Sequence, residues 1–188
     1  MLILSGFIVF GKEFLLIWVG EGYTEAYYVA IVVMIPFSVD LAQNLALAIL
    51  QVKKQYGFRA KIYLLSAMIN VVTTVILTSY FGIIGAAIST GLSMFITSGL
   101  IMNWYYLKKA SLDIVKFWKE SFKVIAASMA IMILALLIKK YISWNSAGLL
   151  QLGMQILLFV SIYVCMIYKF IMTSEERKQI LAFVKRKL

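Results

Sequence analysis

Long stretches without charge alternate with short clusters of Lys, Arg, Asp and Glu along this chain of 188 residues. No charged residue occurs in residues 62–107 or 141–168, and residues 26–52 contain only Asp40. A helix of about 20 apolar residues crosses the hydrocarbon core of a bilayer. Because backbone amides in hydrocarbon must be paired internally, such stretches form helices or closed barrels. Barrel strands alternate apolar and polar positions, and VILTSYFGIIGAAI (residues 75–88) does not. The sequence therefore predicts an all-α, polytopic membrane helical bundle.

The same pattern predicts about five full transmembrane helices in one bundle that covers residues 1–188. We expect a partial helix at 1–10, spans at about 28–51, 62–79, 85–106, 120–141 and 149–168, and an amphipathic surface helix at 173–188. Residues 11–25 are predicted to be a loop with aromatic anchors at the level of the lipid headgroups. Residues 80–84 are predicted to be a tight connection. Apolar residues recur at helical spacing in residues 108–123, which suits a helix lying in the membrane interface.

Composition supports a membrane location. Hydrophobic residues make up 63% of the chain and charged residues only 14%, which is more apolar surface than a soluble domain of this size can bury. In so apolar a chain, the net charge of +10 indicates loops beside anionic lipid and not a nucleic-acid partner. The chain has no His and a single cysteine, Cys165, so we expect no disulfide, no metal site and no cofactor.

The distribution of Lys and Arg predicts the orientation. If the C-terminus is cytoplasmic, 15 of the 18 basic residues lie in the loops at 53–61 and 108–123 and in the C-terminal tail. Cytoplasmic loops carry such an excess of Lys and Arg in multi-pass membrane proteins. We therefore expect a multi-pass membrane protein whose C-terminus lies in the cytoplasm.

Asp40 lies near the middle of the span expected at 28–51. A carboxylate at that depth is costly, so it should face a protein interior or a water-filled cavity. Gln43 and Asn44 share its helix face, and Pro36, one turn earlier, should kink the helix. One interpretation is a polar face that lines a transport cavity, and the other is hydrogen bonding that only aids helix packing.

Asn70 lies at a similar depth in the next predicted span. We expect Asp40 to face Asn70 or the cavity, since the pattern places no Lys or Arg at that depth. An Asn amide can donate to either form of a carboxyl group. Adhesion between helices is the alternative role for Asn70.

Arg59 and Lys61 lie with Lys53 and Lys54 at one predicted cytoplasmic mouth. Such a cluster could attract the diphosphate headgroup of a lipid. The alternative is that these residues only set the orientation of the chain in the membrane.

The order of several motifs resembles the C-terminal half of bacterial polysaccharide flippases, which transport O-antigen and other lipid-linked oligosaccharides. The similar segments are GKEFLLIWVGEGYTEAYYV (11–29), AQNLALAIL (42–50), KKQYGFRAKIYLLSAMINVV (53–72) and YFGIIGAAISTGLS (80–93). These flippases belong to the multidrug, oligosaccharidyl-lipid and polysaccharide exporter superfamily. The resemblance implies a protein of the bacterial inner (cell) membrane, with one of two helical lobes around a cavity. That cavity moves undecaprenyl-diphosphate-linked sugars to the outer leaflet by alternating access. It also implies that this chain is a fragment or a truncated product, because the N-terminal lobe is missing.

Other functions remain open from the sequence. A cation-coupled drug or metabolite exporter of the same superfamily could use Asp40 as its ion or proton site. A structural membrane subunit could pack against a partner without transporting anything. A membrane enzyme such as a polysaccharide polymerase would need a large external loop with catalytic residues, and the longest loop is predicted to be cytoplasmic. We therefore expect no enzyme activity, and partners limited to membrane lipids, a prenyl-diphosphate-linked sugar and the N-terminal lobe.

Overall fold

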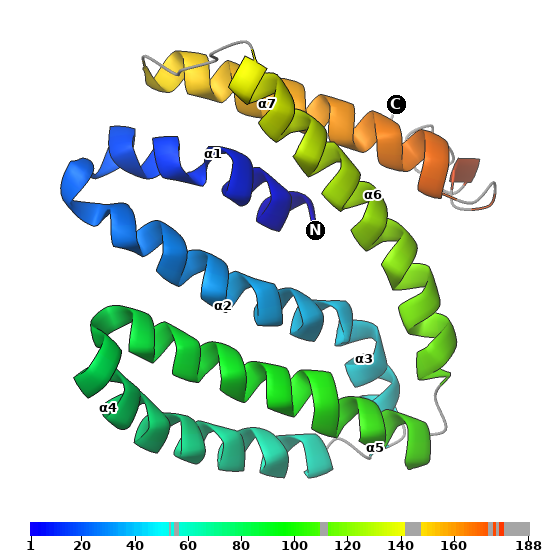
Figure 1. Ribbon diagram of the computed structural model, residues 1–188. Coiled ribbons are helices and arrows are strands. Elements are labelled where there is room, and N and C mark those ends of the chain that lie inside the picture. Colours follow the sequence, from blue (N-terminus) through cyan, green and yellow to red (C-terminus); the bar gives the residue numbers. More distant parts are fainter. Residues whose placement is uncertain are drawn as a thin grey trace. The chain divides into compact units, whose positions relative to one another are not determined.

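A computed structural model shows α-helices along the part of the chain that it describes (Figure 1). It describes residues 1–52, 54, 57–109, 113–141, 148–172, 175 and 177–178, and no strand occurs among them. The helices are α1 (Leu2–Trp18), α2 (Thr24–Ala42), α3 (Asn44–Val52), α4 (Gly57–Met94), α5 (Asn103–Lys108), α6 (Ile114–Tyr141) and α7 (Leu149–Met166). A 3-10 turn covers Glu21–Tyr23, and π-helical segments cover Phe95–Met102 and Ile167–Ile171. The expected all-α membrane helical fold is confirmed.

Four helical segments among the described residues are long and apolar enough to cross a membrane. They are Glu21–Ala42, Gly57–Lys108, Ile114–Tyr141 and Leu149–Ile171. The second contains 52 residues and would extend about 78 Å if it were straight, which is more than twice the thickness of a bilayer core. It therefore has to fold back, and the chain is a multi-pass membrane protein.

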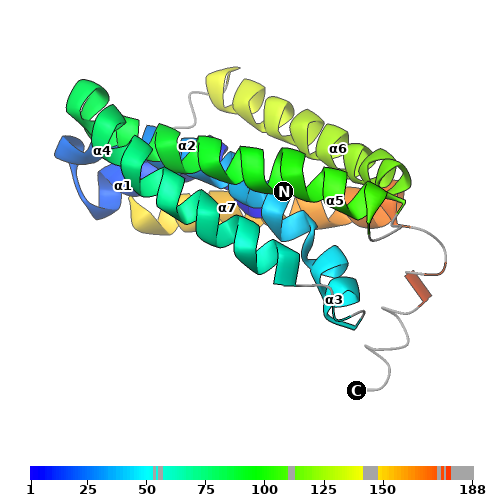
Figure 2. The ribbon, with the colours of Figure 1, turned by 90° about the horizontal axis from the view of Figure 1, so that it is seen from below.

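The fold-back occurs at Gly82, inside the connection expected at 80–84. Gly82 has φ 59° and ψ −142°, a conformation that glycine adopts without the steric cost of a Cβ atom. The two arms on either side run antiparallel, so Ser66 bonds Thr97 at 2.6 Å while Thr73 bonds Ser89 at 2.5 Å. Figures 1 and 2 show the two arms side by side and joined by this turn at one end.

Close approach of the arms near the turn depends on a second glycine. A Cβ atom on Gly85 would lie 2.2 Å from the carbonyl oxygen of Leu77. Small residues at helix interfaces in membranes allow backbones to approach in this way. Gly85 therefore permits the tight packing of the two arms.

The chain divides into two compact units. One contains residues 18–118, with α2, α3, α4 and α5, and the other contains residues 1–17 and 119–188, with α1, α7 and most of α6. In the second unit α1, α6 and α7 share a core of Val9, Ile131, Phe159 and Tyr163. The hydroxyl groups of Tyr163 and Ser128 lie 2.6 Å apart inside this unit, so both buried groups are paired.

The N-terminal helix is longer than the sequence suggested. The expected boundary at residue 10 is wrong, because α1 continues through Gly11 to Trp18. One glycine within a helix costs only about 1 kcal/mol, which the good helix formers after it offset. The loop expected at 11–25 is thus reduced to a short connection and the 3-10 turn before α2.

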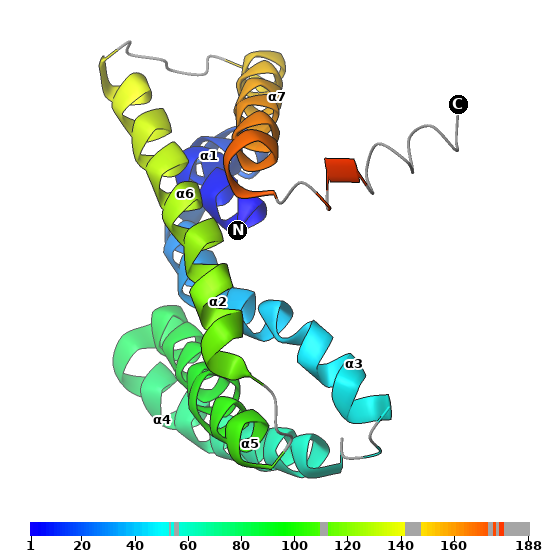
Figure 3. The same ribbon diagram turned by 90° about the vertical axis from the view of Figure 1, so that its right-hand side faces the viewer.

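The expected span at 28–51 is interrupted. α2 ends at Ala42, Gln43 takes φ −83° and ψ 3°, and α3 begins at Asn44. Figure 3 shows α3 leaving the direction of α2 at this point. α2 remains helical through Pro36, where a kink was expected, and the break in the helix lies about two turns later, at Gln43.

The fourth span differs from the expectation, and the expected C-terminal helix lies almost entirely outside the described residues. Residues 114–123 belong to α6, which continues to Tyr141, so they do not form a separate interfacial helix. α6 has 28 residues, enough to cross a bilayer without adjustment. The amphipathic helix predicted at 173–188 falls almost entirely outside the described residues.

Candidate functional site

One carboxylate oxygen of Asp40 is the centre of a polar cluster in the unit of residues 18–118. Three described side chains donate to Asp40 Oδ1: Arg59 Nη2 at 3.0 Å, Ser98 Oγ at 2.8 Å, and the hydroxyl of Tyr63. The side chain of Asp40 is 16% exposed and that of Arg59 is 10% exposed. Asp40 and Arg59 therefore form a largely buried ion pair between the C-terminal part of α2 and the first turn of α4.

Arg59 is held in place by more than Asp40. Its Nη1 donates to the hydroxyl of Tyr106 at 3.1 Å, and its Nη2 also donates to Tyr63 at 3.1 Å. The guanidinium lies 4.8 Å from the centre of the Tyr63 ring, which is within the range of a cation–π interaction. These partners compensate for the loss of water around the charge, because buried charges are stable only when paired and hydrogen-bonded.

Gln43 extends the cluster at the helix break. It is 1% exposed, and its Nε2 donates to the carbonyl of Ser98 at 2.8 Å and to Asn103 Oδ1 at 3.2 Å. Trp118 Nε1 donates to the same Asn103 oxygen at 3.1 Å. Gln43 Oε1 is buried and has no hydrogen-bond partner among the described residues. The break between α2 and α3 is thus fastened to the π-helical segment Phe95–Met102, and π-helical turns frequently occur at functional sites.

An apolar cluster adjoins the polar one, and Tyr106 belongs to both. Leu50, Met102, Tyr106 and Ile114 are buried together, and Phe58 stacks on Tyr105 with ring centres 4.2 Å apart. Such surroundings lower the local dielectric constant, which strengthens the electrostatic interactions within the cluster. They also make it costly to remove one member and leave its partner unpaired.

The expected contact between Asp40 and Asn70 is wrong, and so is the expectation that no basic residue is available to Asp40. Sequence reasoning placed Arg59 in a loop, but α4 begins at Gly57 and therefore includes Arg59. Its long side chain reaches from the first turn of α4 to the carboxylate on α2. Asp40 consequently lies inside the protein, as expected, but with a cation for a partner.

Asn70 instead joins the two arms of α4. Its Oδ1 accepts from Ser89 at 2.7 Å and from Thr74 at 3.3 Å, and its Nδ2 donates to Thr90 at 3.5 Å. All of these partners lie within the α4 hairpin. This arrangement favours the packing role that the sequence left open for Asn70.

The remaining candidates are distributed differently. Asn44 and Lys61 are exposed in the structure, so both are available to ligands or lipid. Pro36 is buried, and a Cβ atom on Gly91 would lie 3.7 Å from its ring, which places Pro36 against the second arm of α4. Arg59, unlike Lys61, forms an ion pair with Asp40.

Sequence reasoning missed most hydroxyl and amide groups of this cluster. Tyr63, Ser98 and Tyr106 contact the ion pair, and Asn103 and Trp118 contact Gln43 or its partner. One signal was present: Arg59 and Tyr63 are four residues apart and so share a helix face. The partners from residues 98–118 depend on the fold-back at Gly82, which spacing along the chain does not reveal.

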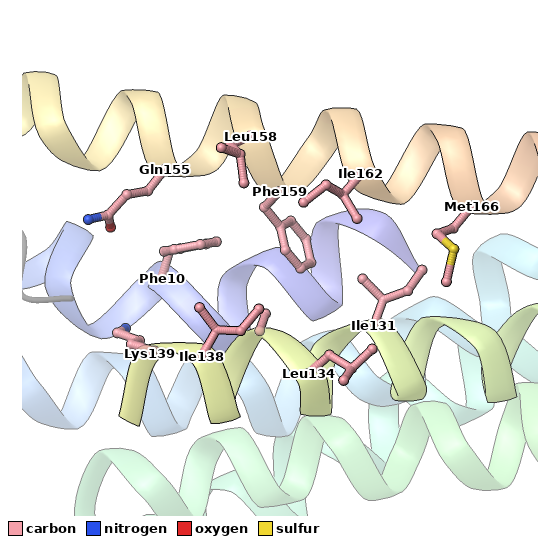
Figure 4. Close-up of a pocket in the computed structure, with 11 residues that line it drawn as sticks. Phe10, Ile131, Leu134, Ile138, Lys139, Gln155, Leu158, Phe159, Ile162 and Met166 are labelled. Atoms are coloured by element: carbon pink, nitrogen blue, oxygen red, sulfur yellow. The ribbon is translucent and has the colours of Figure 1, made fainter. Parts of the chain in front are cut away.

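The other unit contains an apolar pocket of about 170 Å³ between α1, α6 and α7 (Figure 4). Its walls include Phe10, Ile131, Leu134 and Phe159. Lys139 lies at one end, where its Nζ donates to the carbonyl of Val9 at 2.6 Å and pairs with Glu13. An apolar pocket of this kind suits a hydrocarbon chain, whereas the cluster around Asp40 and Arg59 offers the polar contacts that could recognise a charged or hydroxylated group.

Comparison with known proteins identifies one flippase-like relative. The chain is 32% identical over 105 residues to a probable low-salt glycan biosynthesis flippase of the archaeon Haloferax volcanii. The matched region covers 54% of this chain and 21% of the relative, so the chain spans about a fifth of the length of that protein. No protein-family model and no solved structure matches the chain. The similarity is to a transporter of glycan biosynthesis and not to an enzyme.

Proposed function

We propose that this chain forms part of a flippase that moves an oligosaccharide linked to a prenyl diphosphate, such as undecaprenyl diphosphate, across the cell membrane. The identity to a glycan biosynthesis flippase is the observation that carries this proposal. The membrane-spanning helices agree with it, because a lipid-linked sugar must be transported within the bilayer. That the cargo is an oligosaccharide and that its carrier is a prenyl diphosphate are both part of what we propose.

The mechanism we propose is alternating access between this helical lobe and a second one. Secondary transporters of this kind bind their substrates near the interface between structurally related halves. The cluster around Asp40 and Arg59 lies at the cytoplasmic side in the orientation that the Lys and Arg distribution favours. Exposed Lys61 and Lys54 at the same end would attract the negatively charged headgroup to it.

A cation-coupled exporter is the second candidate, with Asp40 as its ion site. The structure gives less support to that function, because Arg59 already neutralises Asp40. A carboxylate beside a guanidinium is a poor ligand for a metal cation, since the cation and the guanidinium repel each other. Asp40 therefore fits an internal ion pair better than it fits a cation site.

Deletion of the reading frame in its native host tests the proposal. The lipid-linked oligosaccharide should accumulate in the cytoplasmic leaflet, and the surface glycan should be lost, because synthesis continues while export stops. The wild-type gene supplied in trans should restore both. An unchanged surface glycan, together with increased sensitivity to drugs, would contradict the flippase and favour the exporter.

A further inference from the structure

The contacts of Asp40 resemble those of a bound anion. Arg59, Tyr63 and Ser98 all direct a donor at the single oxygen Oδ1. Tyr106 supports the arrangement by accepting from the other terminal nitrogen of Arg59. A guanidinium surrounded by hydroxyl groups provides the kind of donors that recognise phosphate and carboxylate oxygens.

We infer that Asp40 is an internal anion that occupies an oxyanion site formed by Arg59, Tyr63 and Ser98, and that a phosphate group of the transported lipid displaces it. This inference rests on the proposed function and adds regulation to it. In the empty transporter Asp40 keeps the site closed, and an incoming diphosphate exchanges with it on Arg59. The site thereby responds to a diphosphate and not to neutral sugars or lipids.

Chemistry favours such an exchange. A diphosphate has more negative charge than a carboxylate and more oxygens with which to accept from the guanidinium and the hydroxyl groups. The ion pair is not sealed off, since 16% of the Asp40 side chain and 10% of the Arg59 side chain remain exposed. A diphosphate can therefore approach the edge of the pair before it displaces the carboxylate.

Displacement has a mechanical consequence because of where Asp40 lies. The residue is three positions before Gln43, at which α2 breaks and α3 begins. Contacts of Asp40 with Arg59, Tyr63 and Ser98 fasten this end of α2 to the first arm of α4 and to the π-helical segment Phe95–Met102. Once Asp40 is released, the nearest contact that still holds this end of α2 is the hydrogen bond from Gln43 to the Ser98 carbonyl. Substrate binding would thus loosen α2 from α4 at the helix break.

Diphosphate binding to the purified full chain in detergent tests the inference. Two probes, inorganic diphosphate and farnesyl diphosphate, are titrated by calorimetry into the wild type and into Asp40→Asn. The variant keeps a side chain of the same shape but removes the competing charge. If Arg59 is free of Asp40 in about a tenth of wild-type molecules, the apparent affinity should rise about tenfold, since affinity is reduced by the fraction that is competent to bind.

Matched variants make the result specific. Glu120→Gln removes the acidic partner of the exposed pair with Lys123 in the other unit, and it should leave both affinities unchanged. Arg59→Gln in the Asp40→Asn background should abolish the gain. Should that double variant fail to fold, Asp40→Gly provides a second test: it should bind diphosphate tightly, and added formate should return its affinity towards the wild-type value.

The outcomes separate the inference from the proposed function. A larger gain for farnesyl diphosphate supports the site and assigns it to a prenyl lipid. An equal gain for the two probes supports the site and assigns it to the diphosphate group alone, even if deletion of the gene leaves the surface glycan intact. Unchanged or weaker binding by Asp40→Asn, or a gain that persists without Arg59, would overturn the inference.

Discussion

Tyr63 lies one helical turn after Arg59 on α4, and its hydroxyl contacts the same carboxylate oxygen of Asp40 that Arg59 holds at 3.0 Å. The two side chains point the same way because residues four apart share a helix face. The tyrosine also accepts a hydrogen bond from Arg59, so each member of the trio is bonded to the other two. A cluster connected in this way fixes the position of α2 against α4.

Breaking the ion pair should destabilise the protein unless both charges are removed together. Asp40→Asn and Arg59→Gln should each cost about 3 kcal/mol, because each leaves one buried charge without its partner. The double variant should be more stable than the sum of the two losses predicts, by about 2 kcal/mol. Unfolding of the detergent-solubilised variants measures all three values.

The exposed pair of Glu120 and Lys123 is the control for this cycle. Both side chains are 59% exposed, so the same cycle should give a coupling of less than about 0.5 kcal/mol. Additive losses at Asp40 and Arg59 would show that the two residues do not depend on each other, contrary to the structure.

The α4 hairpin should be sensitive to added volume at Gly85. Its Cβ would meet the backbone of Leu77, so Gly85→Ala should cost about 3 kcal/mol through overpacking. Gly153, on α7, has no atom within 4 Å of an added Cβ, and Gly153→Ala should be neutral or slightly stabilising. Thermal unfolding of both variants distinguishes them, and equal stability would argue against close approach of the arms.

The ion pair between Glu13 and Lys139 should stabilise the unit of α1, α6 and α7. Both side chains are 22% exposed, and Lys139 also donates to the Val9 carbonyl. Glu13→Gln should therefore lower the free energy of unfolding by about 2 kcal/mol, whereas Glu25→Gln at an exposed position should change it by less than about 0.5 kcal/mol. Similar losses for the two variants would mean that the pair contributes little.

Topology can be tested with single cysteines in a Cys165→Ser background. Lys54 lies between α3 and α4, and Glu21 begins the turn between α1 and α2. The Lys and Arg distribution predicts that Lys54→Cys is labelled by an impermeant maleimide from the cytoplasmic side and Glu21→Cys from the outside. Labelling of both positions from one side would contradict the proposed orientation.

The sequence predicted the helical class because charge-free stretches of membrane length leave few alternatives. It also located the reversal near Gly82, where glycine falls between two apolar segments. It did not predict the break at Gln43, because the amide side chain there is fixed by Ser98 and Asn103, residues that only the folded chain brings close. Helix breaks held by distant contacts leave no periodic signal in the local sequence.

The candidate site was predicted only in part, because its partners too are brought together by the fold. Asp40 was identified because an ionisable residue in an apolar stretch is unusual. Arg59 was identified only as part of a basic loop, because it is one of four basic residues close together and the sequence does not show which of them points inward. Which basic residue pairs with Asp40 depends on where α4 begins. Helix boundaries taken from sequence are uncertain by a few residues.

The most direct measurement of the central claim is the fraction of lipid-linked oligosaccharide that an impermeant reagent reaches from outside spheroplasts. The deletion strain is supplied with the wild type, with Arg59→Gln, or with Lys123→Gln as a control at an exposed position. We predict that the wild type and Lys123→Gln restore the outward-facing fraction, and that Arg59→Gln leaves it as low as in the deletion strain. Full restoration by a folded Arg59→Gln protein present at wild-type abundance would contradict the account.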